Sequence, residues 1–453
     1  MSKKIGKYIL EEKLSRGTFG VCYKAKDDKN KEYAIKKIEI VNQKETEGII
    51  NEINILKIMK SKHSVEFIES IKNEEYFYII MELCEGDLNY LIKKRNGNID
   101  IVTIIKITNQ LNEVFQLMRK KKIEHRDLKP ANILIKFNNE DDFDIKLTDY
   151  GLLKSYQNSL SEFTSIVGSN YYRAPEVYKK KRNPKSDLWS IGIIIYYLYF
   201  NQLPFKDFND YFNTNQKVKL KKTNFELLDD LILKLIVKDS DKRINWDDYF
   251  NHPFNSLQII QIYVNTEKDN SNTKILGEKF EIEQLKDATI FIDENKEEFN
   301  INLNLNKGKH KIDILFNNIL TSCESMFSEC KEIIEIKFIN FITNKVTDMS
   351  FMFNKCSNLI TLDVSNFNTV NVNNMKAMFQ ECSKLNNLDV SNFITNKVTD
   401  MSFMFCNCSN LNDLDVRNFN TINVKSSKNM FYNCPIIEKV KNLNNIKNLK
   451  DIY

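Results

Sequence analysis

The feature that most constrains the fold is an internal repeat of 26 residues in the second half of the chain. A unit of this length cannot bury its own apolar face, so successive copies must stack and share one continuous core. Residues 340–353 recur without change as residues 392–405, which indicates an internal duplication. The repeats therefore predict a solenoid. Its Met-Phe pairs begin at Met326, Met352, Met378, Met404 and Met430.

The repeats also carry a cysteine at the same period, from Cys330 to Cys434. Evenly spaced cysteines invite a metal or disulfide interpretation, but each would come from a different repeat and no histidine keeps the same spacing. Small apolar thiols are common in protein cores. We therefore expect a buried ladder of thiols, and only the close pair Cys406 and Cys408 leaves both interpretations open.

The first half of the chain has a different pattern, centred on His-Arg-Asp-Leu-Lys-Pro-Ala-Asn at residues 125–132. This stretch joins a carboxylate, a cation and an amide, and Asp149-Tyr150-Gly151 follows it. A glycine-rich loop and a strand lysine precede it and Ala174-Pro175-Glu176 comes after, in the order that protein kinases use. Residues 1 to about 255 thus resemble the protein kinase family. The resemblance implies a bilobal α+β fold that uses ATP and Mg²⁺.

The segment 15–21 resembles the family's glycine-rich loop, in which missing side chains let backbone amides approach phosphates. Ser15 stands where the family has its first glycine. The end of the apolar run at Met81 resembles the hinge over the adenine, with Met81 at the back of the pocket. A hairpin turn and a plain core methionine are the alternatives. The resemblance implies an ATP site made by Ser15, Gly17, Gly20, Val21, Ala34, Lys36, Met81, Glu82 and Cys84.

Phosphoryl transfer depends on positioning and charge neutralisation, so its site needs cations, metal ligands and backbone donors. Lys36 matches the lysine that holds the α and β phosphates, and Glu52, on a segment with helical apolar spacing, matches its ion-pair partner. The resemblance makes Asp127 the acceptor of the substrate proton and Lys129 a neutraliser of the moving phosphoryl group. Asn132 and Asp149 would hold the metal. A lysine two residues after the aspartate is typical of serine/threonine kinases.

Residues 149–176 correspond to the family's activation loop. A phosphate on Thr164 or Ser165 would order this loop through charge-assisted bonds to Arg126. Ser169 matches the hydroxyl that faces the catalytic aspartate in serine/threonine kinases. Tyr150 replaces the usual phenylalanine, and its hydroxyl needs a partner if it is buried.

Composition limits the other functions. The net charge is +5, from 66 basic and 61 acidic residues, which is too small to indicate nucleic acid or an anionic membrane as a partner. The longest apolar run, residues 191–200, is half the length needed to span a bilayer, and the first residues have no apolar signal core. We expect a cytoplasmic or nuclear protein with reduced cysteines.

The predicted domains are a protein kinase domain at 1–256, a linker and β-rich cap at 257–310, and a solenoid at 311–453 that resembles BspA-like leucine-rich repeats. The polar stretch 268–273 is the expected linker. The predicted function is an ATP-dependent serine/threonine protein kinase acting on protein substrates, with the repeats binding a protein partner or inhibiting the kinase. A catalytically silent kinase-fold scaffold is the alternative.

Overall fold

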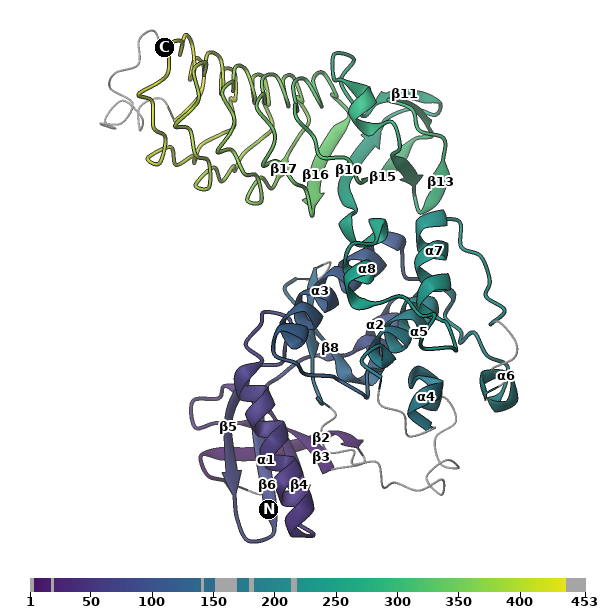
Figure 1. The fold of residues 1–453 in the computed structure, drawn as a ribbon. Coiled ribbons are helices and arrows are strands. Elements are labelled where there is room, and N and C mark those ends of the chain that lie inside the picture. The colour runs from purple at the N-terminus through teal and green to yellow at the C-terminus, as the bar shows by residue number, and fades with distance from the viewer. Residues whose placement is uncertain are drawn as a thin grey trace. The chain divides into compact units, whose positions relative to one another are not determined.

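The structure is a computed structural model, and it describes residues 4–17, 20–139, 142–150, 169–178, 183–212 and 218–436. It separates into two compact units, Met1–Asn255 and Ser256–Tyr453 (Figure 1). Each is described by itself. No helix within the described ranges is long and apolar enough to cross a membrane.

The first unit begins with an antiparallel sheet of six strands in the order β1-β2-β3-β4-β6-β5. Helix α1 (Gln43–Ile58) contacts β5 of this sheet and buries Ile49, Ile53 and Leu56 (Figure 1). The apolar spacing explains the helix, because these residues recur every three or four positions on one face. The strands are β1 (Lys4–Ile5), β2 (Tyr8–Gly17), β3 (Gly20–Lys26), β4 (Glu32–Glu39), β5 (Phe67–Lys72) and β6 (Tyr76–Glu82).

The rest of this unit is mainly helical. In the small sheet β7-β8-β9, the predicted catalytic loop comes directly before β8, and Asp149 follows β9. Helix α5 is buried nearly all round, and a Cβ added to Gly192 would lie 2.7 Å from the Leu235 Cβ of α7, so the two helices pack closely. The elements are β7 (Gly86–Asp87), α2 (Leu88–Lys94), α3 (Ile101–Lys120), η1 (Pro130–Asn132), β8 (Ile133–Phe137), β9 (Phe143–Leu147), η3 (Ser169–Tyr172), α4 (Pro175–Tyr178), α5 (Ser186–Phe200), α6 (Phe208–Phe212), α7 (Glu226–Leu235), α8 (Trp246–Phe250) and η4 (Pro253–Ser256).

The second unit starts with a sheet in the order β13-β12-β15-β10-β16-β17. The expected linker at 268–273 is not a linker in the structure, because β11 (Ser271–Lys274) pairs with β14 (Asn302–Leu305) inside this unit. The central strand β10 begins at Gln258, two residues into this unit, and is buried along most of its length. The remaining elements are β10 (Gln258–Thr266), η5 (Ile282–Leu285), β12 (Thr289–Ile292), β13 (Asn295–Glu297), β15 (Gly308–Phe316), β16 (Ile333–Ile339) and β17 (Thr361–Leu362).

Beyond β16, residues that are 26 apart in sequence contact one another, as the successive green to yellow loops in Figure 1 illustrate. Backbone bonds join one copy to the next, for example from Phe353 N to Met378 O at 2.9 Å. Five phenylalanine rings stack with centroids 5.5 Å apart and planes within 8° of parallel. In the described copies, regular strand is limited to β16 and β17, and single parallel bridges join other positions of successive copies. The stacked rings belong to Phe327, Phe353, Phe379, Phe405 and Phe431.

The cysteines of the repeats lie inside this core, and all nine cysteines of the chain are free. The Cys356, Cys382 and Cys408 thiols each donate to the carbonyl of a phenylalanine 29 residues earlier, at 3.0 to 3.1 Å. Burial raises the pKa of these three thiols well above the ordinary value. The prediction of a buried thiol ladder is confirmed.

Candidate active site

One face of the first sheet brings together three of the predicted ATP-site residues, Ala34, Lys36 and Met81. Lys36 pairs with Cys22 across β3 and β4, and Ala34 pairs with Met81 across β4 and β6. Directly opposed residues share a face, and Ala34 and Lys36 are two positions apart, so all four side chains lie on the same side. The prediction of Val21 is corrected, because Val21 pairs with Lys37 and faces the other side. At this end of β3 it is Cys22 that lies on the Lys36 side of the sheet.

The amine of Lys36 bridges two carboxylates from distant parts of the chain. Its Nζ lies 2.7 Å from Glu52 Oε1 on α1 and 2.7 Å from Asp149 Oδ1 after β9. Burial disfavours the charged amine, but Asp149 and Glu52 raise the pKa of Lys36 above its usual value. The Lys36 side chain is therefore held as a cation in a fixed position. Glu52 is 4% exposed, so its partner is what allows a carboxylate there.

The loop before β8 arranges charged groups around Asp127. Lys129 Nζ lies 2.9 Å from Asp127 Oδ2, and the Asn132 side-chain amide donates to the Asp127 carbonyl at 2.7 Å. Arg173 Nη2 lies 3.1 Å from Asp127 Oδ1. Our sequence reasoning missed Arg173. Its position directly before Ala174-Pro175-Glu176 was the available signal.

A buried carboxylate on α5 holds this loop in place. Asp187 accepts hydrogen bonds from the backbone amides of His125 and Arg126, both at 2.8 Å. The His125 ring is fully buried and donates from Nε2 to the Thr148 carbonyl at 3.0 Å. Burial lowers the pKa of His125, which keeps the ring neutral. The loop is thus tied both to α5 and to the residue before Asp149.

The turn after β9 directs Asp149 and Tyr150 to different surroundings. Asp149 has a φ of 57°, a left-handed conformation that aspartate tolerates better than most residues. Its side chain is 43% exposed and reaches Lys36, whereas Tyr150 is 1% exposed. The Tyr150 hydroxyl lies 3.0 Å from Ser64 Oγ, so the buried hydroxyl has the partner that the sequence required.

At the hinge, the side chains of Glu82 and Cys84 lie in different environments. The Glu82 carboxylate lies 3.0 Å from Lys146 Nζ, also pairs with Lys136, and accepts the Glu66 amide at 2.9 Å. Glu82 pairs with Tyr33, so its side chain lies on the face opposite to Lys36. Any contact of Glu82 with a base on the Lys36 face must therefore come from its backbone. Burial raises the pKa of Cys84 to about 12, which keeps this thiol protonated.

The described ends of the glycine-rich loop are paired, with Ser15 opposite Cys22 and Gly17 opposite Gly20. A Cβ on Gly20 would lie 2.2 Å from the Lys37 carbonyl oxygen, so this position requires glycine. Residues 18 and 19 lie outside the described residues, and so do Thr164 and Ser165 of the predicted activation loop. Ser169 begins η3.

A buried ion pair joins Arg243 to Glu176, the last residue of the Ala174-Pro175-Glu176 motif. The Arg243 guanidinium makes two bonds to the Glu176 carboxylate, at 2.7 and 3.0 Å, and both side chains are buried. A buried bidentate pair is geometrically specific. It fixes the start of α4, which begins two residues after Arg173.

The residues predicted to hold Mg²⁺ fit that ion chemically. Asn132 and Asp149 offer the oxygen ligands that Mg²⁺ prefers, and the Asn132 amide nitrogen is engaged by the Asp127 carbonyl, which leaves the amide oxygen as its acceptor. No cluster of three or more His, Cys, Asp or Glu side chains suited to a metal occurs among the described residues. A small protein donor set is normal for Mg²⁺, which is usually completed by phosphate oxygens and water.

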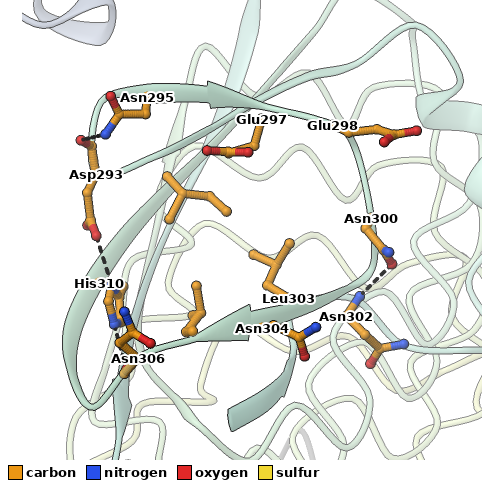
Figure 2. Close-up of a pocket in the computed structure, with 12 residues that line it drawn as sticks. Asp293, Asn295, Glu297, Glu298, Asn300, Asn302, Leu303, Asn304, Asn306 and His310 are labelled. Carbon is orange, nitrogen blue, oxygen red and sulfur yellow. Dashed lines mark hydrogen bonds and ion pairs between the residues drawn. The ribbon is translucent and has the colours of Figure 1, made fainter. Parts of the chain in front are cut away.

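Hollows large enough for a ligand occur in both units. One of about 480 Å³ borders the hinge and is lined by Leu14, Tyr33, Leu83 and Cys84 among others. Another of about 450 Å³ lies in the second unit, where β13, the following loop and β14 present carboxylates and amides around an open concavity (Figure 2). None of the residues around Lys36 or Asp127 lines this second hollow. The charged constellation in the first unit is the candidate active site.

This bilobal fold, with a lysine bridged to a helix glutamate and to an aspartate after a strand, defines a protein kinase domain. The profile of the protein kinase domain family matches residues 8–255, which is more than half of the chain. The chain belongs to the protein kinase family. A second profile, described as a Mycoplasma protein of unknown function, DUF285, matches residues 321–445.

Several known protein kinases match a little over half of this chain. The chain is 33% identical over 270 residues to the serine/threonine-protein kinase atg1 of Dictyostelium discoideum, covering 56% of this chain and 40% of the relative. It is 33% identical over 262 residues to calcium-dependent protein kinase 29 of Arabidopsis thaliana, covering 54% and 48%. With serine/threonine-protein kinase ULK3 of Mus musculus it shares 32% over 264 residues, covering 55% of each. The chain therefore spans only about half the length of these relatives.

Proposed function

We propose that the first unit is an active ATP-dependent serine/threonine protein kinase that phosphorylates protein hydroxyls. The observation that carries the proposal is the bridge from Lys36 to Glu52 and Asp149, since it unites residues 16 and 113 positions apart. The names of the relatives support serine/threonine specificity, as does Lys129 beside Asp127.

Each residue has a defined task in this proposal. Lys36 binds the α and β phosphates while Glu52 fixes its position. Asp127 accepts the proton of the substrate hydroxyl, and Lys129 neutralises charge on the transferring phosphoryl group. The adenine lies against Ala34, Met81 and the backbone of residues 82–84. The glycine-rich loop covers the phosphates.

Asn132 and Asp149 would hold the Mg²⁺. The ion, when bound, neutralises charge on the phosphate oxygens. Within the protein, the contact with Lys36 already restrains Asp149. Burial disfavours the charged Asp149 carboxylate, but the positive charge of Lys36 outweighs this effect and lowers the pKa of Asp149. Asp149 therefore stays ionised and ready for a cation.

Activation-loop phosphorylation belongs to the proposal as well. A phosphate on Thr164 or Ser165 would compete for Arg126, whose Nε lies 3.0 Å from Glu124 Oε2 in the structure. Full activity of a protein with alanine at Thr164 and Ser165 would reject those two sites.

The test is transfer of radiolabelled phosphate by the full chain to a protein substrate, compared with Asp127→Asn. Loss of a general base lowers the rate by roughly 100- to 10,000-fold. Asp142→Asn is a matched control, because Asp142 lies in the hairpin between β8 and β9, is 48% exposed and pairs with Lys106 on α3. Transfer equal in the wild type and Asp127→Asn would reject the enzyme and leave the silent scaffold, which a nucleotide-binding titration with Mg²⁺ would examine further.

For the second unit we propose a β-rich cap followed by a solenoid of BspA-like leucine-rich repeats, with boundaries at 257–310 and 311–453. The 26-residue contacts and the match to residues 321–445 support it. Its role is to dock a protein partner or to inhibit the kinase. The specific activity of residues 1–256 compared with the full chain separates these roles, because an inhibitory module gives a more active fragment. The nine free thiols support a cytoplasmic or nuclear location.

A further inference from the structure

Arg173 is a cation in the candidate site to which no motif assigns a task. Its Nη2 lies 3.1 Å from Asp127 Oδ1, and the Lys129 amine lies 2.9 Å from Asp127 Oδ2. Each oxygen of this carboxylate therefore has its own cationic neighbour. Such a pair restricts rotation of the carboxylate about its Cβ–Cγ bond, because turning it would break both contacts.

The backbone around Arg173 is fixed by side chains from two helices. On α5, Trp189 Nε1 donates to the Tyr171 carbonyl at 3.2 Å, and Ser190 Oγ donates to the Tyr172 carbonyl at 2.7 Å. The Tyr211 hydroxyl of α6 donates to the carbonyl of Arg173 itself. Three consecutive carbonyls thus have defined partners, so the guanidinium starts from a rigid base.

The same helix also holds Asp127. Asp187, in the first turn of α5, accepts the amides of His125 and Arg126, the two residues before Asp127. Residues 187 to 190 therefore position both partners of the Arg173–Asp127 contact. Since one rigid element supports both ends, the separation of guanidinium and carboxylate is built into the fold.

The contact is also shielded from water. The side chains of Arg173 and Asp127 are 28% and 14% exposed, and the guanidinium carbon lies 6.0 Å from the centre of the Tyr178 ring. A partly buried pair of this kind is screened less than a surface ion pair. Arginine suits the position better than lysine, because its planar donors orient a carboxylate.

We infer that Arg173 is a positioning residue that aligns the Asp127 carboxylate for the substrate hydroxyl. The inference rests on the proposed function of Asp127. Alignment matters because displacement of a catalytic group by about 1 Å can cost roughly 100-fold in rate.

The experiment measures kcat and the KM for ATP in the full chain for wild type, Arg173→Met and Arg173→Lys. We expect Arg173→Met to lower kcat by about 10- to 100-fold with the KM for ATP unchanged, since its effect lies at Asp127 and away from the nucleotide. Arg173→Lys keeps the cation and should recover part of the loss. Arg417→Met is the matched control, because Arg417 is 75% exposed and pairs with Asp415 in the repeats.

A double mutant shows whether Arg173 acts through Asp127. Added to Asp127→Asn, Arg173→Met should lower the residual rate by less than about twofold, whereas independent damage to the fold would lower it as much as in the wild type. An unchanged or raised kcat in Arg173→Met overturns the inference, and so does full additivity or no recovery by lysine. An inactive wild type instead removes the proposed function, and the inference with it.

Discussion

The two units of the molecule build their essential contacts over different distances in sequence. In the first unit, Lys36 meets Glu52 and Asp149, and Glu176 meets Arg243, with separations from 16 to 113 residues and no common spacing. In the second, Phe379 stacks on Phe353 and Phe405, each 26 residues away. The candidate site of the first unit is built from a few particular polar pairs, whereas the described ring stack of the second repeats one apolar contact four times.

The contrast can be tested first by removing one ring from the stack. Phe379→Ala should lower the free energy of unfolding of the second unit by about 3 to 5 kcal/mol, because Phe379 is fully buried between two rings. Both tryptophans, Trp189 and Trp246, lie in the first unit. In a urea titration we therefore expect a shift in the circular dichroism transition of the repeats but not in tryptophan fluorescence.

The control for this experiment is Tyr432→Ala, since Tyr432 is an aromatic residue of the repeats that is 55% exposed. Its removal should leave both transitions in place. If Phe379→Ala moved the fluorescence transition as far as the circular dichroism transition, the two units would unfold together and the contrast would fail.

A smaller effect is expected from a polar pair in the first unit. Tyr150→Phe removes the hydroxyl that bonds to Ser64, and both groups are buried. The expected loss is about 1 kcal/mol, read from tryptophan fluorescence in urea. Phosphate transfer should be unchanged, because phenylalanine is the usual residue of the family here. A tenfold slower transfer would show that the hydroxyl takes part in the site.

The smallest expected effect concerns the four histidines, whose pKa shifts differ between the units. Burial lowers the pKa of His63, His125 and His252 in the first unit. In the second, burial opposes the charge of His310, but bonds to Asp293 and the Asn306 carbonyl, at 2.7 and 2.8 Å, raise its pKa. Both ring nitrogens of His310 face acceptors, which only the protonated ring satisfies.

These shifts predict opposite responses to pH. A lowered pKa in the folded state means that the first unit loses stability as pH falls below the unfolded value of about 6.5. A raised pKa means that His310 stabilises the second unit fully below about 6.5, and that this contribution is lost as pH rises through the folded value. The His310 contribution should be below about 1 kcal/mol, because Asp293 is 47% exposed.

Urea titrations between pH 6 and 8 measure both responses. On acidification the fluorescence transition should move to lower urea and the circular dichroism transition of the repeats to higher urea. His310→Gln should remove the second shift and leave the first. Shifts of the same sign in both units would contradict the assignment.

In both units, some features could not be predicted from the sequence. The catalytic-loop motif located Asp127 and Lys129, but it did not indicate Arg173, whose contact depends on three carbonyls held by α5 and α6. Val21 was predicted as part of the segment 15–21 that resembles the glycine-rich loop, and only the pairing of β3 with β4 showed that Cys22 faces Lys36. The polar stretch 268–273 looked like a linker because its partner, β14, lies some thirty residues further on.

By itself the sequence determined the membership of the first unit in its family, the 26-residue period and the burial of the cysteines. These properties follow from local motifs and from a period, which a single chain displays directly. The tertiary structure alone decided which side of a strand faces the site, which helix holds the catalytic loop, and which cation accompanies Asp127. Such contacts join residues with no fixed spacing, so they exist only once packing has brought the elements together.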